Sequence, residues 1–364
     1  MKIVFDNIIF SLQKSGGISV YWYELISRML NQSDINCLFI EEKSKNGNIF
    51  RDQLTIDANY FFFCDYKWSN FLGRYRSLEL KTKNDNFIFH SSYYRTVSKS
   101  VKKKNNIQEI VTVHDFTYER FSSGLKKWVH SWQKKKAIKA ADVVICISEN
   151  TKKDLLYFYP QFSNKDIRVV YNGVSKDYNV IPELKETNDN TPFFLFVGSR
   201  TGYKNFDFVV EAVSTLENYV LKIVGGPLSK NESIFLEKNL SGRWQFIENV
   251  DNLQLNVLYN QAFALLYPSS YEGFGIPIVE AMKAGCPFIS IRGSSITEVA
   301  GEAGYLMEEL NIEDFNLGVE LIKNNRDKIV ELGLLQANLF SWDKCFDEML
   351  EIYKELNNKI ILNN

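Results

Sequence analysis

The sequence lacks the residue patterns of a zinc site or a disulfide framework. Its five cysteines (37, 64, 146, 286 and 345) are scattered along 364 residues with no CxxC pair, and the three histidines have no metal-ligand spacing. The cysteine pattern fits a reducing cytosol. We therefore expect no bound metal.

Long hydrophobic runs are also missing. No apolar run approaches the roughly 20 residues that a helix needs to cross a bilayer, and the opening "MKIVFDNIIFSLQK" is interrupted by Asp6, Asn7 and Gln13, unlike a secretory signal. We therefore expect a cytoplasmic protein. A composition of 45% hydrophobic and 24% charged residues is typical of a globular chain, and 364 residues favour two domains.

Charge is unevenly distributed, although the net charge is only −1. Residues 1–180 contain 28 Lys and Arg against 18 Asp and Glu, whereas the remainder contains 15 against 26. The basic excess lies in 97–106 and 124–142, where Trp128 and Trp132 share one helical face among lysines. This pattern suits an anionic membrane surface or a lipid-linked acceptor. A solvated lysine-rich helix face is the alternative, and nucleic acid is not expected because no recognition motif accompanies the charge.

Short apolar strands alternate with helical stretches along both halves of the chain. Such alternation predicts an α/β protein with two doubly wound parallel sheets. The polar, proline-marked segment 175–192 is the expected linker, and 341–358 has amphipathic helical spacing. Ligands in such sheets bind beyond the carboxyl ends of the strands, so a cleft between the domains is the expected site. The expected strands are 2–5, 36–40, 59–63, 86–92, 109–115, 142–148 and 167–173, then 193–199, 221–226, 244–250, 264–270 and 287–291.

The stretch "SSYEGFGIPIVEAMKAGCP" (269–287) predicts a strand end, a glycine-rich bend and a short helix. The amides of Gly273, Phe274, Gly275 and Ile276 would lie at the helix N-terminus, where the helix dipole favours an anion. We expect Glu280 in the first helical turn.

Two glutamates, Glu272 on the bend and Glu280 in the helix, flank this anion site. Carboxylates beside a phosphate repel it unless they bind hydroxyls or offset a developing positive charge. Sugar hydroxyls next to a diphosphate meet that requirement. The alternative is an ordinary strand–turn–helix unit with a surface acid at 272 and a dipole-stabilising acid at 280.

Three more candidates follow other strands. Arg200 and Lys204, in "SRTGYKNF", would neutralise a diphosphate without a metal. The pair Gly16-Gly17 precedes a helix and would allow close backbone approach to an anion. His114 ends the strand of "EIVTVHDF", where a structural role is the alternative to a catalytic one.

Together these pieces resemble glycosyltransferase family 4, whose members have the GT-B fold. The resemblance rests on the order of the Gly-Gly loop, "VHD", "ADVVICISENTKKDL", "IRVVYNGV", "FVGSRTGYKNF" and "SSYEGFGIPIVEAM", with two glutamates separated by seven residues. It covers nearly the whole chain. It implies two Rossmann-like domains facing a cleft, an acceptor-binding domain (1–176) and a nucleotide-sugar-binding domain (177–342), and a C-terminal helix and tail (343–364) that cross back to the first.

The resemblance also implies roles for the candidate residues. Glu280 would bind the ribose of a nucleotide-sugar donor, Glu272 would face the donor sugar, and the amides of Phe274 and Gly275 would hold sugar or phosphate. Arg200 and Lys204 would lie on the diphosphate, Gly17 near the phosphates, and His114 near the donor sugar. The family retains anomeric configuration and uses no metal or other cofactor.

The expected activity is transfer of a sugar from a nucleotide-diphosphate sugar to a glycan or lipid-linked saccharide in cell-surface polysaccharide or lipopolysaccharide assembly. The lysine-rich first half favours such an acceptor and a peripheral position at the inner face of the membrane. Two alternatives are a non-catalytic nucleotide-sugar-binding subunit and a GT-B sugar-nucleotide epimerase.

Overall fold

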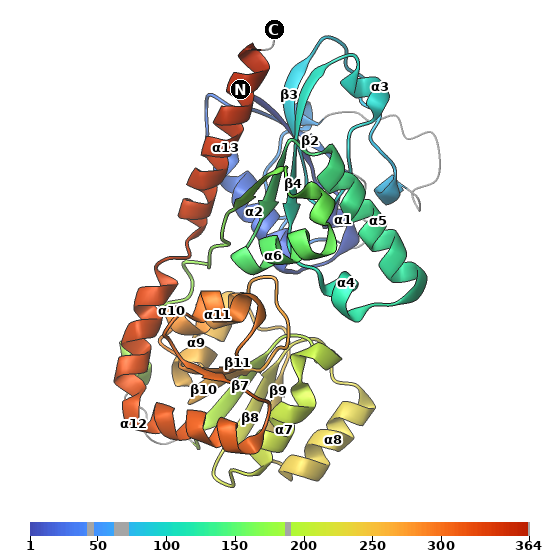
Figure 1. Cartoon of the computed structure of the whole chain (residues 1–364). Coiled ribbons are helices and arrows are strands. Elements are labelled where there is room, and N and C mark those ends of the chain that lie inside the picture. The colour runs from blue at the N-terminus through green and yellow to red at the C-terminus, as the bar shows by residue number, and fades with distance from the viewer. Residues whose placement is uncertain (42–46, 62–72, 186–190, 363–364) are drawn as a thin grey trace. The chain divides into compact units, whose positions relative to one another are not determined.

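The computed structural model describes residues 1–41, 47–61, 73–185 and 191–362. The chain divides into two compact units (Figure 1). Unit 1 comprises Met1–Gly173 and Trp342–Asn364, and unit 2 comprises Val174–Ser341. The N-terminal segment of unit 1 thus ends at Gly173, three residues before the boundary expected at 176.

Unit 1 is built on a parallel six-stranded sheet of order β2-β1-β3-β4-β5-β6. The order reverses between β1 and β3, so the loops after these strands diverge and leave room for a ligand. The strands are β1 (Lys2–Asp6), β2 (Asn36–Ile40), β3 (Asn86–Ser91), β4 (Asn106–Val113), β5 (Val143–Cys146) and β6 (Asp166–Val169).

Helices cover both faces of this sheet, as a buried parallel sheet requires (Figure 1). They are α1 (Ile9–Leu12), α2 (Gly17–Met29), α3 (Lys99–Lys102), α4 (Thr117–Phe121), α5 (Gly124–Ala140), α6 (Glu149–Phe158) and α13 (Trp342–Leu362), with 3₁₀ turns at Ala58–Tyr60, Gly73–Tyr75 and Pro160–Phe162.

The strand expected at 59–63 is wrong for the residues that are described. Residues Ala58–Tyr60 form a 3₁₀ turn capped by Asp57, and Phe61 makes one isolated bridge to Phe39. Residues 62 and 63 lie outside the described part of the chain. The aspartate side chain accepts from the amide of Asn59, a local bond that competes with strand pairing.

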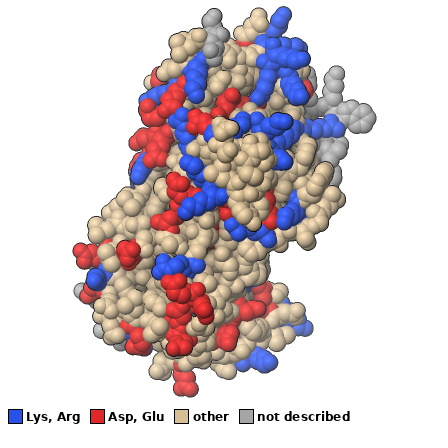
Figure 2. Space-filling view, in the orientation of Figure 1, with Lys and Arg blue, Asp and Glu red and all other residues tan. Residues whose placement is uncertain are grey.

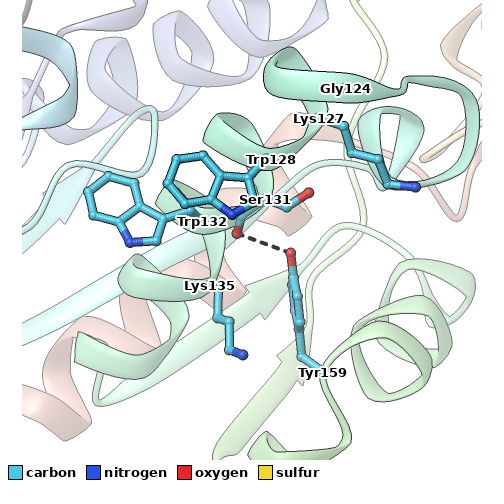
Figure 3. Close-up of a pocket in the computed structure, with 7 residues that line it drawn as sticks. All are labelled: Gly124, Lys127, Trp128, Ser131, Trp132, Lys135 and Tyr159. Carbon is cyan, nitrogen blue, oxygen red and sulfur yellow. Dashed lines mark hydrogen bonds between the residues drawn. The ribbon is translucent and has the colours of Figure 1, made fainter.

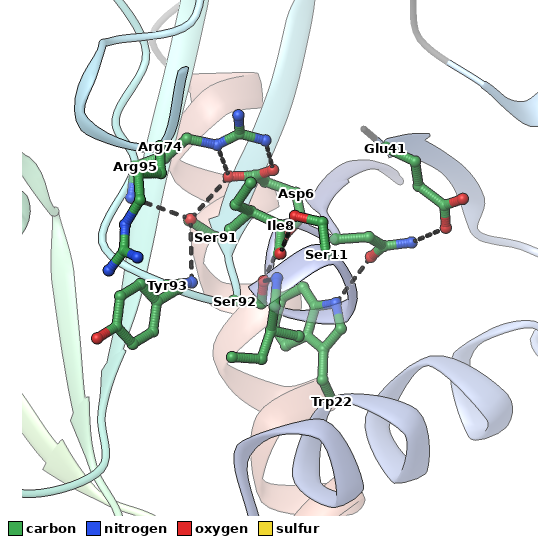
Figure 4. Close-up of polar contacts among 12 residues, drawn as sticks. Asp6, Ile8, Ser11, Trp22, Glu41, Arg74, Ser91, Ser92, Tyr93 and Arg95 are labelled. Carbon is green, nitrogen blue, oxygen red and sulfur yellow. Dashed lines mark hydrogen bonds and ion pairs between the residues drawn. The ribbon is translucent and has the colours of Figure 1, made fainter. Parts of the chain in front are cut away.

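A fully buried ion pair joins the end of β1 to the loop after β3, at the reversal point of unit 1. Asp6 accepts from Nε of Arg95 at 2.8 Å and from a second guanidinium nitrogen, and from the hydroxyl of Ser91 at 2.9 Å (Figure 4). Both charged side chains have no exposed surface, so neither could stand there unpaired. This contact fixes the loop that follows β3.

Unit 2 has a second parallel sheet, of order β12-β11-β10-β7-β8-β9. Its order reverses between β7 and β10, the arrangement of dinucleotide-binding folds. The strands are β7 (Phe193–Val197), β8 (Val220–Val224), β9 (Trp244–Ile247), β10 (Ala264–Tyr267), β11 (Phe288–Ile291) and β12 (Tyr305–Met307), of which the sequence did not predict the last.

The helices of unit 2 flank this sheet (Figure 1). A core of aliphatic and aromatic side chains packs in this unit. The helices are α7 (Phe206–Ser214), α8 (Lys230–Leu240), α9 (Asn252–Gln261), α10 (Ile276–Lys283), α11 (Ser294–Ala300) and α12 (Ile312–Ala337), with 3₁₀ turns at Pro182–Lys185 and Gly202–Lys204.

Part of the expected linker, 175–192, is bound to unit 2. The amide of Asn179 donates to Oδ1 of Asn256 at 3.1 Å, and the amide of Ile181 donates to Oδ1 of Asn260 at 2.7 Å. Asn260 in turn donates to the carbonyl of Asn179 at 2.9 Å. Two asparagines of α9 thereby hold this segment by its backbone. Residues 186–190 lie outside the described part.

The C-terminal helix α13 packs in the core of unit 1, which confirms the predicted return to the N-terminal domain. Its Tyr353 is fully buried, with the hydroxyl 2.6 Å from Nδ1 of His90. Nε2 of the same histidine lies 2.9 Å from Oγ1 of Thr112. Burial lowers the pKa of His90 to about 3, so the ring is neutral at physiological pH.

Replacing Tyr353 by Phe is expected to destabilise unit 1 by about 1–3 kcal/mol, because a nitrogen of buried His90 loses its partner. Urea unfolding followed by circular dichroism measures this. The matched control is Tyr157→Phe, whose side chain is 75% exposed and should stay within about 0.5 kcal/mol of wild type. Equal midpoints for the two variants would contradict the role assigned to Tyr353.

Candidate functional site

Two loops at the reversal point of the unit 2 sheet bring most of the predicted residues to one edge. The loop after β7 carries Arg200 and continues into the 3₁₀ turn that ends at Lys204. The loop after β10 carries Glu272 and leads into α10. Because β7 and β10 are adjacent and parallel, both loops leave the sheet at its carboxyl edge.

An ion pair connects the two loops. The ammonium group of Lys204 contacts Oε1 of Glu272 and lies 3.0 Å from the hydroxyl of Tyr267, which donates to the same carboxylate oxygen at 2.8 Å. The lysine and glutamate side chains are 11% and 15% exposed. Lys204, Tyr267 and Glu272 therefore each contact the other two. The two charged side chains keep a small exposed surface.

The backbone of the bend is also fixed. The amide of Glu272 donates to Oγ of Ser294 at 3.1 Å, and Oγ of Ser295 donates to the carbonyl of Glu272 at 2.8 Å. Gly275 precedes α10 with φ of 100°, a conformation that disfavours any side chain. Phe274 is buried against Phe340, with ring centroids 5.4 Å apart. These contacts hold the backbone of the bend in a conformation in which the Glu272 side chain reaches Lys204.

Arg200 is held by a different carboxylate. Its Nε donates to Oε1 of Glu232 at 2.6 Å, and Nη2 donates to the carbonyls of Gly226 and Pro227, each at 2.8 Å. The side chain is 7% exposed, and its buried Nη1 has no hydrogen-bond partner among the described residues. The guanidinium therefore keeps one buried donor that is unsatisfied within the described part of the chain.

Glu232 serves both the arginine and its own helix. Its carboxylate accepts from the amide of Ser229, the N-cap residue of α8, at 2.7 Å. Burial alone would raise the pKa of Glu232, but the bonds from Ser229 and Arg200 lower it to about 2. The carboxylate stays ionised throughout the physiological range and holds the arginine in place.

Glu280 lies in the second turn of α10, so the expected first-turn position is wrong. The helix begins at Ile276, with Pro277 as its second residue, and its first turn contains no acid. The half-buried Glu280 carboxyl accepts from the hydroxyl of Tyr259 at 3.0 Å. Burial raises the pKa of Glu280 to about 7, against hydrogen bonds from Tyr259 and Tyr178. Burial and the tyrosine hydrogen bonds, rather than the helix dipole, therefore set the pKa of Glu280.

The remaining predicted residues belong to unit 1. Gly17 begins α2 and Gly16 is its N-cap, where a Cβ atom would lie 2.7 Å from Oε1 of Gln13. His114 is buried edge-on against Tyr21, with ring centroids 5.1 Å apart. Burial lowers the pKa of His114 to about 4, so the ring is neutral. Both positions lie at the carboxyl edge of the unit 1 sheet.

Sequence reasoning missed three residues of this site. The hydroxyl of Tyr267 donates to Glu272, and the hydroxyl of Tyr259 donates to Glu280. No sequence pattern distinguishes such tyrosines from aromatic residues of the core. Glu232 could have been found, because Ser229 and Glu232 have the S-x-x-E spacing of a capping box. The roles of the predicted residues toward a ligand stay predictions.

No group of three or more His, Cys, Asp or Glu side chains among the described residues is arranged to hold a metal ion. No helix in the described part of the chain has the length and hydrophobicity to cross a membrane.

Two family models match the chain in succession. The "Glycosyltransferase Family 4" model matches residues 15–178, and the "Glycosyl transferases group 1" model matches residues 178–333. An uncharacterised glycosyltransferase of Methanocaldococcus jannaschii is 28% identical over 280 residues, 74% of this chain and 76% of the relative. The O-antigen chain mannosyltransferase RfbU of Salmonella typhimurium is 32% identical over 188 residues, 50% of this chain and about half (51%) of that protein.

Solved structures agree with the fold. Sucrose-phosphate synthase from Thermosynechococcus elongatus matches with a TM-score of 0.76 and 16% identity over 98% of this chain and 99% of that one. HepE from Anabaena, solved with UDP and glucose, matches with a TM-score of 0.70 and 15% identity over 97% and 99%. The chain belongs to the family 4 type of glycosyltransferases and has the GT-B fold, which confirms the resemblance.

Glu280 should make stability depend on pH. Its folded pKa of about 7 exceeds the reference value of 4.5, so the folded state holds a proton that the unfolded state has lost. The acid therefore increasingly destabilises the fold as pH rises from about 4.5 to above 7. The Glu280→Gln variant keeps an acceptor for Tyr259. We expect its melting temperature to exceed that of wild type by a margin that grows as pH rises from 5 to 8. Exposed Glu302→Gln is the control. A difference that is constant with pH would contradict the shift.

Proposed function

We propose that this protein transfers a sugar from a nucleotide-diphosphate sugar to a saccharide acceptor, with retention of anomeric configuration and without a metal ion. The observation that carries the proposal is the cluster of Lys204, Glu272 and Tyr267 at the reversal point of the unit 2 sheet. Family membership supplies the class of reaction, and the residues supply the roles below.

The donor's diphosphate requires positive charge, and two cations lie on the loop after β7. The buried Nη1 of Arg200 has no hydrogen-bond partner among the described residues, and the Lys204 ammonium retains one N–H beyond its contacts with Glu272 and Tyr267. Charge-assisted hydrogen bonds of this kind stabilise a departing phosphate as a divalent ion does elsewhere. HepE, with the same fold, was solved with UDP and glucose, which favours a nucleotide-sugar donor here.

The donor's ribose hydroxyls and its sugar would each face a carboxylate. Glu280 would accept from the ribose, and the amides of residues 273–276 would bind phosphate or sugar. Transfer breaks the bond between the anomeric carbon and the phosphate oxygen while the acceptor oxygen bonds to that carbon. The acceptor's proton passes to the leaving phosphate. Glu272 would offset the positive charge that develops on the anomeric carbon.

We place this reaction in the assembly of cell-surface polysaccharide or lipopolysaccharide. The similarity to an O-antigen chain mannosyltransferase supports a glycan or lipid-linked saccharide acceptor. A non-catalytic nucleotide-sugar-binding subunit and a sugar-nucleotide epimerase are the alternatives. The first would bind donor without consuming it, and the second would change the sugar without an acceptor.

An exposed aromatic and basic surface on α5 supports binding to an anionic membrane from the cytoplasm. Trp128 and Trp132 are 64% and 44% exposed, and the preceding Leu125 is 75% exposed. With Lys127 and Lys135 the two indoles line a cavity of about 430 Å³ (Figure 3). Further Lys and Arg side chains gather over the α3 side of unit 1 (Figure 2). Indole rings prefer the bilayer interface, and lysines attract anionic lipids.

Replacing Glu272 by Gln is expected to lower kcat by at least about tenfold, or 1.4 kcal/mol, because the amide cannot offset charge at the anomeric carbon. Affinity for the free nucleoside diphosphate, which lacks the sugar, should hardly change. Transfer to a saccharide acceptor is followed by NMR, which also reads the anomeric configuration of the product. Excess EDTA should leave the wild-type rate unchanged.

Each alternative predicts a different result in this assay. Wild-type turnover by Glu272→Gln would make the acid structural, and loss of activity in EDTA with recovery in Mg²⁺ would refute metal independence. Tight donor binding with no product identifies a binding subunit. An altered nucleotide sugar formed without acceptor identifies an epimerase.

The α5 surface predicts co-sedimentation with vesicles that contain an anionic phospholipid and release as salt rises. Each lysine near such a surface contributes on the order of 1 kcal/mol. The double change of Trp128 and Trp132 to Ser should abolish binding. The control is Leu335→Ser, which removes a side chain 61% exposed on α12. Equal binding to neutral vesicles, or none at all, would leave α5 as a solvated face.

A further inference from the structure

Unit 1 contains a second cavity, at the reversal point of its own sheet. The cavity is about 290 Å³, near the lower end of the range for ligand pockets, about 300–1,000 Å³. Its lining comes from α1 after β1, from Tyr93 and Tyr94 after β3, and from Asp115 after β4. This is the edge at which a doubly wound sheet binds its ligand. The volume suits one ring rather than an oligosaccharide.

Aromatic rings form much of the cavity wall. Tyr118 of α4 stacks on His130 of α5, with ring centroids 3.9 Å apart and planes 14° apart. Tyr93 and Tyr94 meet the same histidine from the β3 loop at 5.9 and 5.7 Å. Burial raises the pKa of both β3-loop tyrosines, so their hydroxyls keep their protons. Flat apolar faces bearing O–H groups suit a sugar ring, which has an apolar face and hydroxyls at its rim.

One cation lines the cavity. Arg74 follows Gly73 in a 3₁₀ turn, and its backbone carbonyl accepts from Nε2 of Gln133 at 2.5 Å. Its guanidinium lies 4.8 Å from the ring of Tyr75 and 5.6 Å from that of Tyr93. The buried Nε has no hydrogen-bond partner among the described residues. Arg74 is thus positioned by its backbone and by stacking, without an ion pair among the described residues.

The other charges at the cavity are arranged differently. Asp115 accepts from the amide of Thr117 at 2.9 Å, and its second carboxylate oxygen has no hydrogen bond within the described residues. Lys134 is paired with Glu119 at 2.7 Å and donates to the carbonyl of Asp115, also at 2.7 Å. Because that pair is internally neutral, Arg74 and Asp115 are the charges available to a ligand.

A polar atom of the aromatic wall is also unsatisfied. His130 is 7% exposed, and its buried Nδ1 has no hydrogen-bond partner among the described residues, with Glu119 3.9 Å away. Burial lowers the pKa of His130 to about 4, so the ring is neutral and adds no charge. A buried nitrogen without a partner is costly unless a ligand supplies one.

We infer that this cavity binds one sugar ring that carries an anionic group, a carboxylate or a phosphate. Arg74 binds the anionic group, Asp115 accepts from ring hydroxyls, and the Tyr118–His130 stack packs against the ring. The inference rests on the proposed function in taking the ligand for the acceptor. It adds that the acceptor's sugar is acidic, which makes Arg74 a specificity-determining residue.

Binding of three small probes to the full-length protein tests this inference. The probes are methyl glucoside, methyl glucuronide and glucose 6-phosphate, titrated by saturation-transfer NMR. We expect at least one anionic probe to bind about tenfold or more tighter than the neutral one, and Arg74→Gln to abolish that preference. Asp115→Asn should weaken all three probes together. The affinity difference between the two anionic probes identifies carboxylate or phosphate as the preferred group.

Two controls locate the binding. Exposed Arg76→Gln, two residues away, should bind like wild type, as should Lys204→Ala in unit 2. Equal affinity for neutral and anionic probes overturns the inference. An anionic preference lost in Lys204→Ala but kept in Arg74→Gln also overturns it, because the probe then binds unit 2. Failure of the proposed function appears separately, as absence of transfer from a nucleotide sugar while probe binding is unchanged.

Discussion

The contact between Lys204 and Glu272 joins two loops that leave adjacent strands in one direction, and the unit 2 site is arranged around it. Parallel strands deliver their following loops to one edge of a sheet, but without a specific contact these loops could take many paths. Here the lysine, the glutamate and Tyr267 satisfy one another at the only reversal of strand order in the unit 2 sheet. Removing either Lys204 or Glu272 would leave the other, largely buried, charge without this partner.

Each of the two candidate cations in unit 2 has a carboxylate partner within the same unit. Glu232 holds Arg200, and Glu272 holds Lys204, so neither positive charge is uncompensated before a ligand binds. Both cations are thereby preorganised, and binding a diphosphate requires no reorganisation of flexible side chains. The Arg95–Asp6 pair orders the β3 loop of unit 1 by the same principle, beside the cavity that Arg74 lines.

The sequence predicted most of the fold because strands and helices alternate with clear periodicity. All but one of the expected strands form. In the exception, the described residues 59 and 60 belong to a 3₁₀ turn that is held by a local bond to Asp57. The site was predicted less completely. Glu272 and Lys204 could be proposed as residues of one edge, since each follows a strand, but their direct contact depends on which strands are adjacent. Glu280 was misplaced because the helix start depends on Gly275, whose backbone conformation the sequence does not specify.

The central claim is that Lys204 and Glu272 act as one catalytic unit at this reversal point. A double-mutant cycle on kcat/KM, with Lys204→Ala, Glu272→Ala and the double variant, tests it most directly. Residues that act as a unit give non-additive losses, so the double variant should be no slower than about the slower single variant. The claim would be contradicted if the double variant lost kcat/KM by the product of the two single-variant factors, because the two free-energy changes would then be additive.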